Sequence, residues 1–327
     1  MKKVLGIGNA LVDILIRIEN DDFFSQFGLA KGSMTLVDRE MMNAILEKAA
    51  SLKIELRKSS GGSVANAIHG MSQLGASVGY IGKTGADDYG SFFRSYMEQN
   101  NICATLFKGK EATGKSMVMV SKDSERTMAT YLGAAVELDA SDLTIEPFKG
   151  YDYFLLEGYL VQNYALVERA ASLARDAGCR IAVDLASFNI VKENLEFLNS
   201  VVEQYVDIVF ANEEESKAFT GKSDPREALD DIAKKCRIAV VKIGKEGSLL
   251  KEGDRLHKIS PIPAAAVDTT GAGDLYASGF FYGLTCGHSL DICGKIGSIT
   301  SGKIVEVVGA KMDNPKWQEV FQLLNGL

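Results

Sequence analysis

The spacing of apolar residues changes along the chain, and this change predicts how its elements are organised. From about residue 150 onward, short apolar runs alternate with stretches in which apolar positions recur at helical spacing. The runs predict strands and the stretches predict helices, in the order 153–156, 165–177, 180–183, 193–204, 207–210 and 238–243. Such alternation is typical of a parallel sheet that is covered on both faces. This half of the chain therefore predicts an α/β fold.

The first half of the chain contains more strand-like patterns. Residues 4–7 form a short apolar run, and apolar residues occupy every second position over 12–18, which is the period of a strand. Helical spacing follows over 41–52 and over 62–74. Residues 103–131 favour β structure, and we interpret them as antiparallel ribbons. Because the chain contains no internal repeat and no Pro-rich linker, we predict no hard domain boundary.

Composition restricts the function classes. The 327 residues are 46% hydrophobic and 24% charged, as in soluble globular proteins, and the net charge of −7 argues against a general nucleic-acid or membrane-surface binder. No apolar segment approaches the roughly 18 residues that a membrane span needs. The cysteines form no C-x-x-C pair and the histidines lie far apart, which leaves no zinc pattern and favours free thiols in a reducing cytoplasm. The first residues predict a strand rather than a signal peptide.

The stretch 268–284, DTTGAGDLYASGFFYGL, carries the strongest chemical signal. Its glycine-rich turn precedes an apolar helix, and a helix start of this kind leaves N–H groups free to bind an anion. Asp274 follows the turn at once, although a carboxylate would repel a bound anion. A phosphoryl-transfer enzyme has a use for both, because the acid takes the proton of the attacking hydroxyl. The alternative is an acid that merely stabilises the first turn of a helix.

Three other stretches carry polar groups beside glycines or strand ends. Gly61 and Gly62 precede a helix on which Asn66 could bind a hydroxyl, or simply face solvent. Asn9 ends a G-x-G run that lacks the third glycine and the helix of a dinucleotide site, and Asp13 follows on the next strand. The acids and amides predicted at carboxyl ends of strands are Glu157, Asp184 and Asn212.

Asn212 begins the sequence Asn-Glu-Glu-Glu, which ends at Glu215. A helix cap followed by acids in the first turn explains this composition. The spacing of Asn212 and Glu215 would also place two groups one turn apart beside Mg²⁺ and its waters.

Residues 109–116 match the P-loop pattern G-x-x-x-x-G-K-[ST]. That loop works only where a helix begins at the Lys-Ser pair, here Lys115 and Ser116. The residues that follow are Met-Val-Met-Val, which predict a strand. We therefore interpret the match as a coincidence, and the P-loop kinase remains as an alternative that a helix at this point would support.

The stretches 61–75 and 268–284 closely resemble the two signatures of the ribokinase (PfkB) family of carbohydrate kinases, in the same order and about 200 residues apart. The resemblance covers essentially the whole chain. It implies a single three-layer α/β/α domain over 1–327, with a mostly parallel central sheet and a small β-sheet lid from roughly 12–36 and 103–133. Residues 8–13 and 31–35 look most similar to the adenosine-kinase-like branch of the family.

The resemblance also implies roles for single residues. The turn formed by Gly271, Ala272 and Gly273 would be the anion hole, and Asp274 after it would be the catalytic base. The acceptor sugar would be held by Asn9, Asp13, Gly61, Gly62 and Asn66. Contacts to the nucleotide and its Mg²⁺ would come from Asn212, Glu215, Lys242, Gly244 and Gly247. The family commonly has Thr at the position of Lys242. A monovalent cation such as K⁺ would be held by Asp268 and Thr270.

The implied activity is transfer of the γ-phosphate of ATP to a primary hydroxyl of a small molecule. The adenosine-kinase-like stretches favour a nucleoside as acceptor. The alternatives are a ribokinase- or fructokinase-type sugar kinase and a sugar- or nucleotide-binding sensor of the same fold without catalysis. The implied cofactors are ATP and Mg²⁺, the protein would be a monomer or a homodimer in the cytoplasm, and neither nucleic acid nor membrane is an expected partner.

Overall fold

A nine-stranded sheet forms the centre of the computed structural model, which describes residues 1–122 and 125–327. The strand order is β14-β13-β12-β11-β10-β9-β1-β5-β6, and all neighbours from β12 to β6 are parallel. Only β13 and β14 at one edge are antiparallel. The strands are β1 Lys3–Ile7, β5 Ser77–Thr84, β6 Ile102–Lys108, β9 Tyr153–Glu157, β10 Arg180–Asp184, β11 Ile208–Asn212, β12 Ile238–Lys242, β13 Ser248–Glu252 and β14 Arg255–Ile259. The mostly parallel sheet predicted from the sequence is confirmed.

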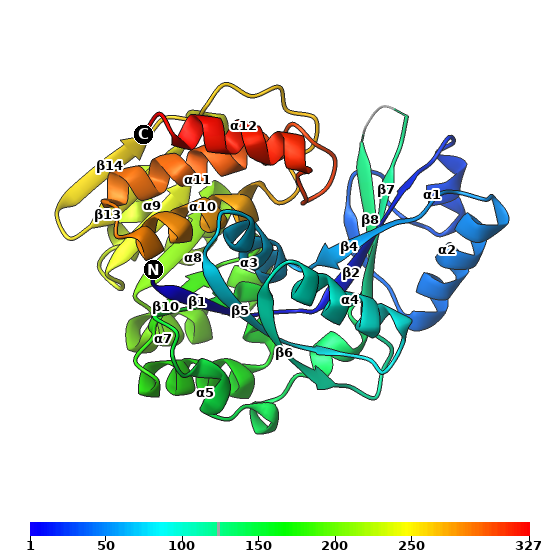
Figure 1. Cartoon of the computed structure of the whole chain (residues 1–327), viewed down its shortest axis with the longest axis horizontal. Helices are drawn as coiled ribbons and strands as arrows, with labels where there is room; N and C mark the ends of the chain where they lie inside the picture. The colour runs from blue at the N-terminus through cyan, green and yellow to red at the C-terminus, as the bar shows by residue number, and fades with distance from the viewer. Residues whose placement is uncertain (123–124) are drawn as a thin grey trace.

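Helices cover both faces of this sheet, which gives three layers (Figure 1). Successive strand residues point to opposite faces, so that Val4 belongs to one core cluster and Leu5 to the other. The helices of the first face are α3 Ser63–Gln73, α4 Asp88–Gln99, α10 Ala272–Cys286 and α11 Leu290–Ile304, and α12 Asn314–Leu324 packs outside them. The second face carries α5 Tyr164–Asp176, α6 Phe188–Glu193, α7 Leu195–Tyr205, α8 Glu213–Thr220 and α9 Pro225–Ile232. Among the described helices, none combines the length and apolar character that crossing a membrane requires.

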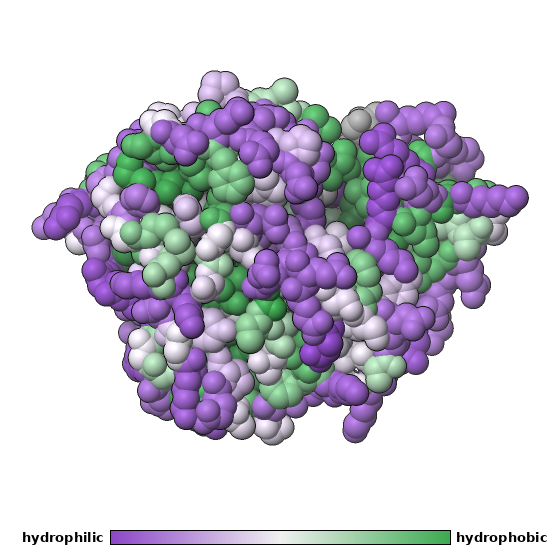
Figure 2. All heavy atoms as spheres, viewed as in Figure 1, coloured by the Kyte–Doolittle hydropathy of each residue, from purple (hydrophilic) through white to green (hydrophobic). Residues whose placement is uncertain are grey.

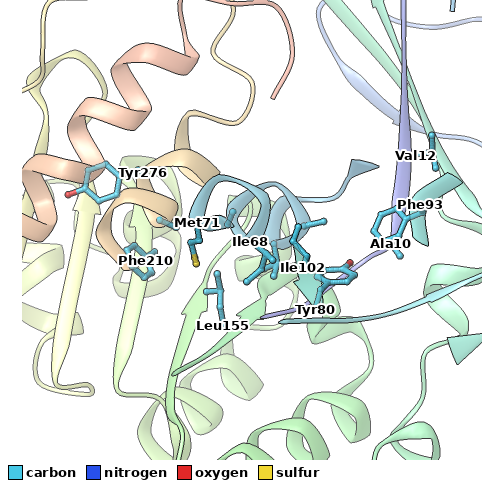
Figure 3. Packing of buried hydrophobic residues seen from close by; sticks show 14 of the residues in the cluster. Ala10, Val12, Ile68, Met71, Tyr80, Phe93, Ile102, Leu155, Phe210 and Tyr276 are labelled. Atoms are coloured by element: carbon cyan, nitrogen blue, oxygen red, sulfur yellow. The ribbon is translucent and has the colours of Figure 1, made fainter. Parts of the chain in front are cut away.

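The helix α3 is the structural centre of the first face. Figure 3 shows Met71 of α3 near Leu155 and Phe210 of the central sheet, on the side of Tyr276 of α10, while Ile68 of the same helix lies beside Tyr80 and Ile102 of the sheet. Both signature stretches therefore pack against each other through one continuous apolar core. This contact fixes the start of α3 beside the start of α10.

A second sheet has five strands in the order β3-β8-β7-β2-β4 and stands beside the main domain (Figure 1). Its strands are β2 Leu11–Arg17, β3 Met34–Leu36, β4 Arg57–Gly61, β7 Gly114–Val120 and β8 Arg126–Tyr131. The helices α1 Asp22–Gln26 and α2 Arg39–Ser51 accompany it. Since β2 follows β1 after a three-residue connection, the chain passes directly from the large sheet into the small one. This small sheet is the lid that the family resemblance implied.

The prediction that 103–131 forms antiparallel ribbons is wrong for its first part. Residues Ile102–Lys108 form β6, which pairs in parallel with β5 at the edge of the large sheet. The physical reason is α4, which lies between the two strands and makes a βαβ crossover, and such a connection joins parallel neighbours. Conversely, β4 completes the small sheet although it lies outside the two predicted lid segments. The helix predicted over 193–204 is α7, and the short helix α6 that precedes it was not predicted.

The P-loop match lies on a strand. Lys115 is the second residue of β7, and its ammonium group lies over the rings of Tyr89 and Tyr131, 4.8 Å and 5.7 Å from their centroids. A strand directs its N–H groups into the sheet ladder rather than toward one anion. The interpretation as a coincidental match is confirmed, and the P-loop alternative is excluded.

The helices α10 and α11 approach each other closely at Gly279, so a larger residue at this position should lower stability. A Cβ atom on Gly279 would lie 2.6 Å from the carbonyl oxygen of Ile296 and 2.5 Å from Oγ1 of Thr300. Gly279→Ala should therefore lower the free energy of unfolding by about 1–3 kcal/mol, because overpacking outweighs the gain in helix propensity. Urea unfolding measures the change. Gly326→Ala is the control, since its Cβ would meet its nearest atom at 3.4 Å, and equal stability of the two variants would contradict the prediction.

Candidate active site

A cavity of about 1620 Å³ opens at the carboxyl ends of the parallel strands, between the large and the small sheet. Residues from distant parts of the chain line it. Of the residues predicted for the site, those in the cavity wall are Asn9, Asp13, Gly62, Asn66, Asn212, Glu215, Lys242, Gly244, Gly247, Thr270, Ala272, Gly273 and Asp274. The remaining three, Gly61, Asp268 and Gly271, are neighbours of these in the chain. The fold thus brings the predicted residues together in one place.

The glycine-rich turn presents the start of α10 to this cavity. Gly271 has a φ of 72°, a left-handed conformation that favours glycine, and a Cβ there would lie 2.8 Å from Cβ of Ala310. No side chain of the described residues caps α10 at this point, so the first N–H groups of the helix are available to an anion. The positive end of the helix dipole adds to this preference.

Two side chains of α3 hold the carboxylate of Asp274. Oγ of Ser63 donates to Oδ1 at 2.7 Å, and Nδ2 of Asn66 donates to Oδ2 at 3.0 Å. Burial raises the pKa of Asp274, and these two hydrogen bonds oppose the rise. The result is a fixed carboxylate that accepts a proton more readily than a free aspartate does. Asn66 itself is only 5% exposed, so the alternative that it faces solvent is wrong.

The two glycines before α3 let the backbone approach Asn9 and Asp13 closely. A Cβ on Gly62, whose φ is 97°, would lie 2.1 Å from the carbonyl oxygen of Asn9. A Cβ on Gly61 would lie 2.1 Å from Oδ1 of Asp13. Side chains at either position would displace the groups that line this end of the cavity.

Glu157, at the carboxyl end of β9, ties the first strand to α3. Its Oε1 accepts from N and Nδ2 of Asn9 at 3.2 and 2.8 Å, and its Oε2 accepts from N of Val64 at 3.1 Å. Burial raises the pKa of Glu157 to about 7, although these donors oppose the rise. Asn9 is thereby fixed in the cavity wall by a partner 148 residues away in the chain.

At the opposite end of the cavity, Asn212 and Glu215 form a reciprocal helix cap. Oδ1 of Asn212 accepts from N of Glu215 at 2.9 Å, and Oε2 of Glu215 accepts from N of Asn212 at 2.8 Å. The capping role considered from the sequence is therefore present. Glu215 is also buried beside a second acid, Asp184, and burial raises its pKa while Lys242 opposes the rise.

Lys242 lies between these acids and the glycine-rich turn. Its Nζ is 3.0 Å from Oδ2 of Asp184 and would be 3.1 Å from a Cβ on Gly273. Although burial lowers the pKa of Lys242, Asp184 and Glu215 raise it, so the ammonium group stays charged. A cation at this position faces the place where an anion would bind the turn.

The donors at this end fit a hydrated Mg²⁺ ion. The described residues contain no group of three or more His, Cys, Asp or Glu side chains that could hold a metal. Mg²⁺ is commonly bound through one or two carboxylates together with water and substrate phosphates. Asp184 and Glu215 supply two carboxylates at this end of the cavity.

Asp268 joins the turn to the small sheet. Its Oδ1 accepts from N and Oγ1 of Thr270 at 2.9 and 2.5 Å and from the guanidinium of Arg126 at 2.6 Å. Its Oδ2 accepts from N of Gly309 at 2.8 Å. Burial raises the pKa of Asp268, but these hydrogen bonds outweigh it and hold the pKa low. Arg126 thus supplies a positive charge beside Asp268, and the predicted monovalent-cation site stays a prediction.

One residue at the centre of the site was missed from the sequence. Nζ of Lys311 donates to Oδ1 of Asn66 at 2.8 Å, next to Asp13 and Asp274. In the sequence it is a single lysine in Gly-Ala-Lys-Met-Asp, outside every motif, and nothing in that pattern indicates burial. Arg126 was missed for the same reason.

Comparisons with known proteins show which family this chain resembles. Residues 30–317 match the model of the pfkB family carbohydrate kinases. The crystal structure of adenosine kinase from Sinorhizobium meliloti has 32% sequence identity and a TM-score of 0.86, over 98% of this chain and 99% of that one. A 5-dehydro-2-deoxygluconokinase from Clostridium botulinum is 28% identical over 82% of this chain and 84% of its own length. A nucleoside kinase from Methanocaldococcus jannaschii is 26% identical over 82% of this chain and 86% of its own length.

The close approach at Gly62 can be tested against a matched glycine. Gly62→Ala and Gly75→Ala both place a side chain in the left-handed region, because the φ of Gly75 is 92°. This costs each variant about 1 kcal/mol. Only the alanine at position 62 also collides with the backbone, since a Cβ at position 75 meets nothing within 4 Å. We therefore expect urea unfolding to show Gly62→Ala as clearly the less stable variant, and equal losses would contradict the role of this contact.

Proposed function

This chain belongs to the pfkB family of carbohydrate kinases, and we propose that it transfers the γ-phosphate of ATP to the primary hydroxyl of a nucleoside. The observation that carries the proposal is the position of Asp274. It is fixed by two side chains of α3 at the start of a helix whose N–H groups are available to an anion. A base and an anion site on one turn are what in-line phosphoryl transfer needs.

In the proposed reaction, Asp274 accepts the proton of the acceptor hydroxyl as that oxygen attacks phosphorus. Asp13, Asn66 and the backbone at Gly62 hold the sugar so that its hydroxyl lies between Asp274 and the phosphate. The raised pKa of Asp274 suits a proton acceptor that works near neutral pH.

The charge on the transferred group is stabilised from two sides. The N–H groups of the turn at 271–273 face its equatorial oxygens, and the ammonium of Lys242 lies beside them. When bound, Mg²⁺ supplies further neutralisation of the ATP phosphates, and Asn212 and Glu215 would orient it through its water ligands, with Asp184 close by. Gly244 and Gly247 let the nucleotide pass close to the backbone of the cavity wall.

The apolar rim of the cavity supports a nucleoside as acceptor. Side chains of the small sheet, of the 3₁₀ segment Gly133–Glu137 and of the two residues that flank this segment line the acceptor end, and they are Leu11, Met34, Leu36, Met128, Leu132, Val136 and Leu138. Met34, Leu36 and Val136 are 49%, 58% and 57% exposed and line the same cavity, and exposed apolar side chains gathered at one site are typical of a binding surface. Figure 2 shows apolar surface between the small sheet and the main domain. A free sugar presents hydroxyls to this rim, whereas a nucleoside presents a flat base.

A sugar or a sugar acid is the second candidate acceptor. The 28% identity to a 5-dehydro-2-deoxygluconokinase supports it. The polar half of the site, with Asp13 and Asn66, suits any ring that carries adjacent hydroxyls. Against it stands the apolar rim, which such a ring would leave uncovered. The sensor alternative has less support, because Asp274 is present and held as a base.

The role of Asp274 predicts a specific loss of turnover. Asp274→Asn should lower kcat by at least about 100-fold, because the amide cannot take a proton. Release of ADP from Mg-ATP in the presence of adenosine, inosine, ribose or fructose measures turnover. Lys115→Met is the control, since Lys115 lies on a strand away from the turn, and it should retain most of the activity. Loss of activity in Lys115→Met with retention in Asp274→Asn would overturn the proposed mechanism.

The acceptor is tested by the same assay with a rim variant. Adenosine or inosine should give a kcat/KM well above that of ribose or fructose. Leu36→Ser should lower kcat/KM for the nucleoside by about tenfold, the effect of losing one leucine contact, and leave that for ribose unchanged. Leu323→Ser is the control, because Leu323 is a 40%-exposed leucine on α12. A preference for free sugars that Leu36→Ser does not alter would move the acceptor to the second candidate.

A further inference from the structure

Lys311 occupies the centre of the site without belonging to any motif. It lies on the segment after α11, which Asp268 holds through the backbone N of Gly309 and which packs through Ala310 against Gly271. This segment therefore has the same anchor as the glycine-rich turn. From it, the side chain of Lys311 extends to the first turn of α3.

A chain of two hydrogen bonds connects Lys311 to Asp274. Nζ of Lys311 donates to Oδ1 of Asn66 at 2.8 Å, and Nδ2 of the same amide donates to Oδ2 of Asp274 at 3.0 Å. An ammonium group has donors only, and a carboxylate has acceptors only. The two partners therefore allow one orientation of the Asn66 amide, with its oxygen toward Lys311 and its nitrogen toward Asp274.

Lys311 is also the positive charge that two acids of the site share. Burial raises the pKa of Asp13 to about 6, Lys311 opposes the rise, and Asp274 adds to it. Burial lowers the pKa of Lys311 to about 8, and Asp13 and Asp274 oppose the fall. The other titratable or charged groups that face Lys311, Asp13 or Asp274 are His69, Tyr96, Arg126, Glu157, Tyr159, Asp184 and Lys242.

We propose that Lys311 is a positioning residue that orients Asn66 toward Asp274 and keeps Asp13 and Asp274 ionised at the same time. The proposal rests on the proposed kinase function, since it concerns the base and the acceptor-binding acid of that reaction. Asp13, Asn66 and Asp274 line the cavity, whereas Lys311 lies behind Asn66. Its effect on the reaction therefore passes through these three residues rather than through a contact with the substrate.

The first test is the pH dependence of kcat/KM. Without the ammonium group, two acids in one site repel each other, and the pKa of the acid that must ionise rises. Lys311→Met should move the acid limb of the profile upward by about one pH unit, so that part of the lost activity returns at higher pH. Lys311→Gln, which can still donate to Asn66, should show the same shift because it carries no charge. Lys311→Arg should keep the wild-type limb.

Lys316→Met is the matched control for these variants. Lys316 also pairs with two carboxylates, Glu306 and Glu319, but it lies on α12. Its replacement should leave the acid limb where it is. An unchanged limb in Lys311→Met, or equal losses in Lys311→Met and Lys311→Arg at every pH, would overturn the proposal.

The second test needs no turnover. Carboxylates whose pKa is raised in the folded state bind more protons there than in the unfolded chain, so stability falls as pH rises from their unfolded pKa through the folded value. Because the Met variant lacks the compensating cation, its urea midpoint should fall more steeply than that of wild type between about pH 4 and pH 8. Parallel midpoints over this range would overturn the charge role.

The two readouts separate the possible failures. If wild type releases no ADP with any acceptor of the panel, the proposed function fails, and the urea midpoints still test whether Lys311 compensates the acids. If wild type turns over an acceptor and the profiles of Lys311→Met stay unshifted, the proposed function stands and the role of Lys311 is wrong.

Discussion

The carboxylates gathered at one edge of the large sheet impose the main constraint on this structure. Glu157, Asp184 and Glu215 are buried, and Asp13 and Asp274 lie in the wall of the same cavity. Removing a carboxylate from water is costly unless hydrogen bonds or an opposite charge compensate it. Glu157, Asp184, Glu215 and Asp274 have such partners, which are backbone and amide N–H groups, a hydroxyl or a lysine, and the charge of Lys311 acts on Asp13. The same burial raises the pKa of Asp274, the base of the proposed reaction.

The connection between the sheets explains how these partners are brought together. β1 belongs to the large sheet and β2 to the small one, so Asp13 stands on the small sheet while Asp274 and Lys311 stand on the main domain. The ion pair between Arg126 of β8 and Asp268 crosses the same boundary. A displacement of the small sheet would therefore separate Asp13 from Lys311 and Arg126 from Asp268 together. Both contacts therefore join the small sheet to the main domain beside the cavity.

The sequence predicted those parts of the site that depend on local geometry. Gly62 and Gly271 adopt backbone conformations that few other residues tolerate, and Asp274 follows the turn it serves, so a short pattern describes the whole arrangement. Lys311 and Arg126 could not be found in this way. Their roles depend on charges that the fold brings from positions far away in the chain, and a single lysine or arginine in a polar segment has no periodicity or spacing that indicates burial. The same limit explains β6, whose place in the large sheet depends on the crossover through α4.

The identity of the acceptor likewise depends on residues that the fold brings together from distant parts of the chain. The proposed reaction needs a base, an anion site and a cation, and the candidates for most of these lie close in sequence to the two signatures. The rim that would contact a base is assembled from β3, β8 and the segment Gly133–Glu137, and each contributes only one to three apolar side chains. No one of these segments is informative alone, because an apolar residue on a strand is expected in any sheet. Only the arrangement in space, with exposed apolar groups in the same cavity wall as Asp13 and Asn66, supports the proposal of a nucleoside rather than a free sugar.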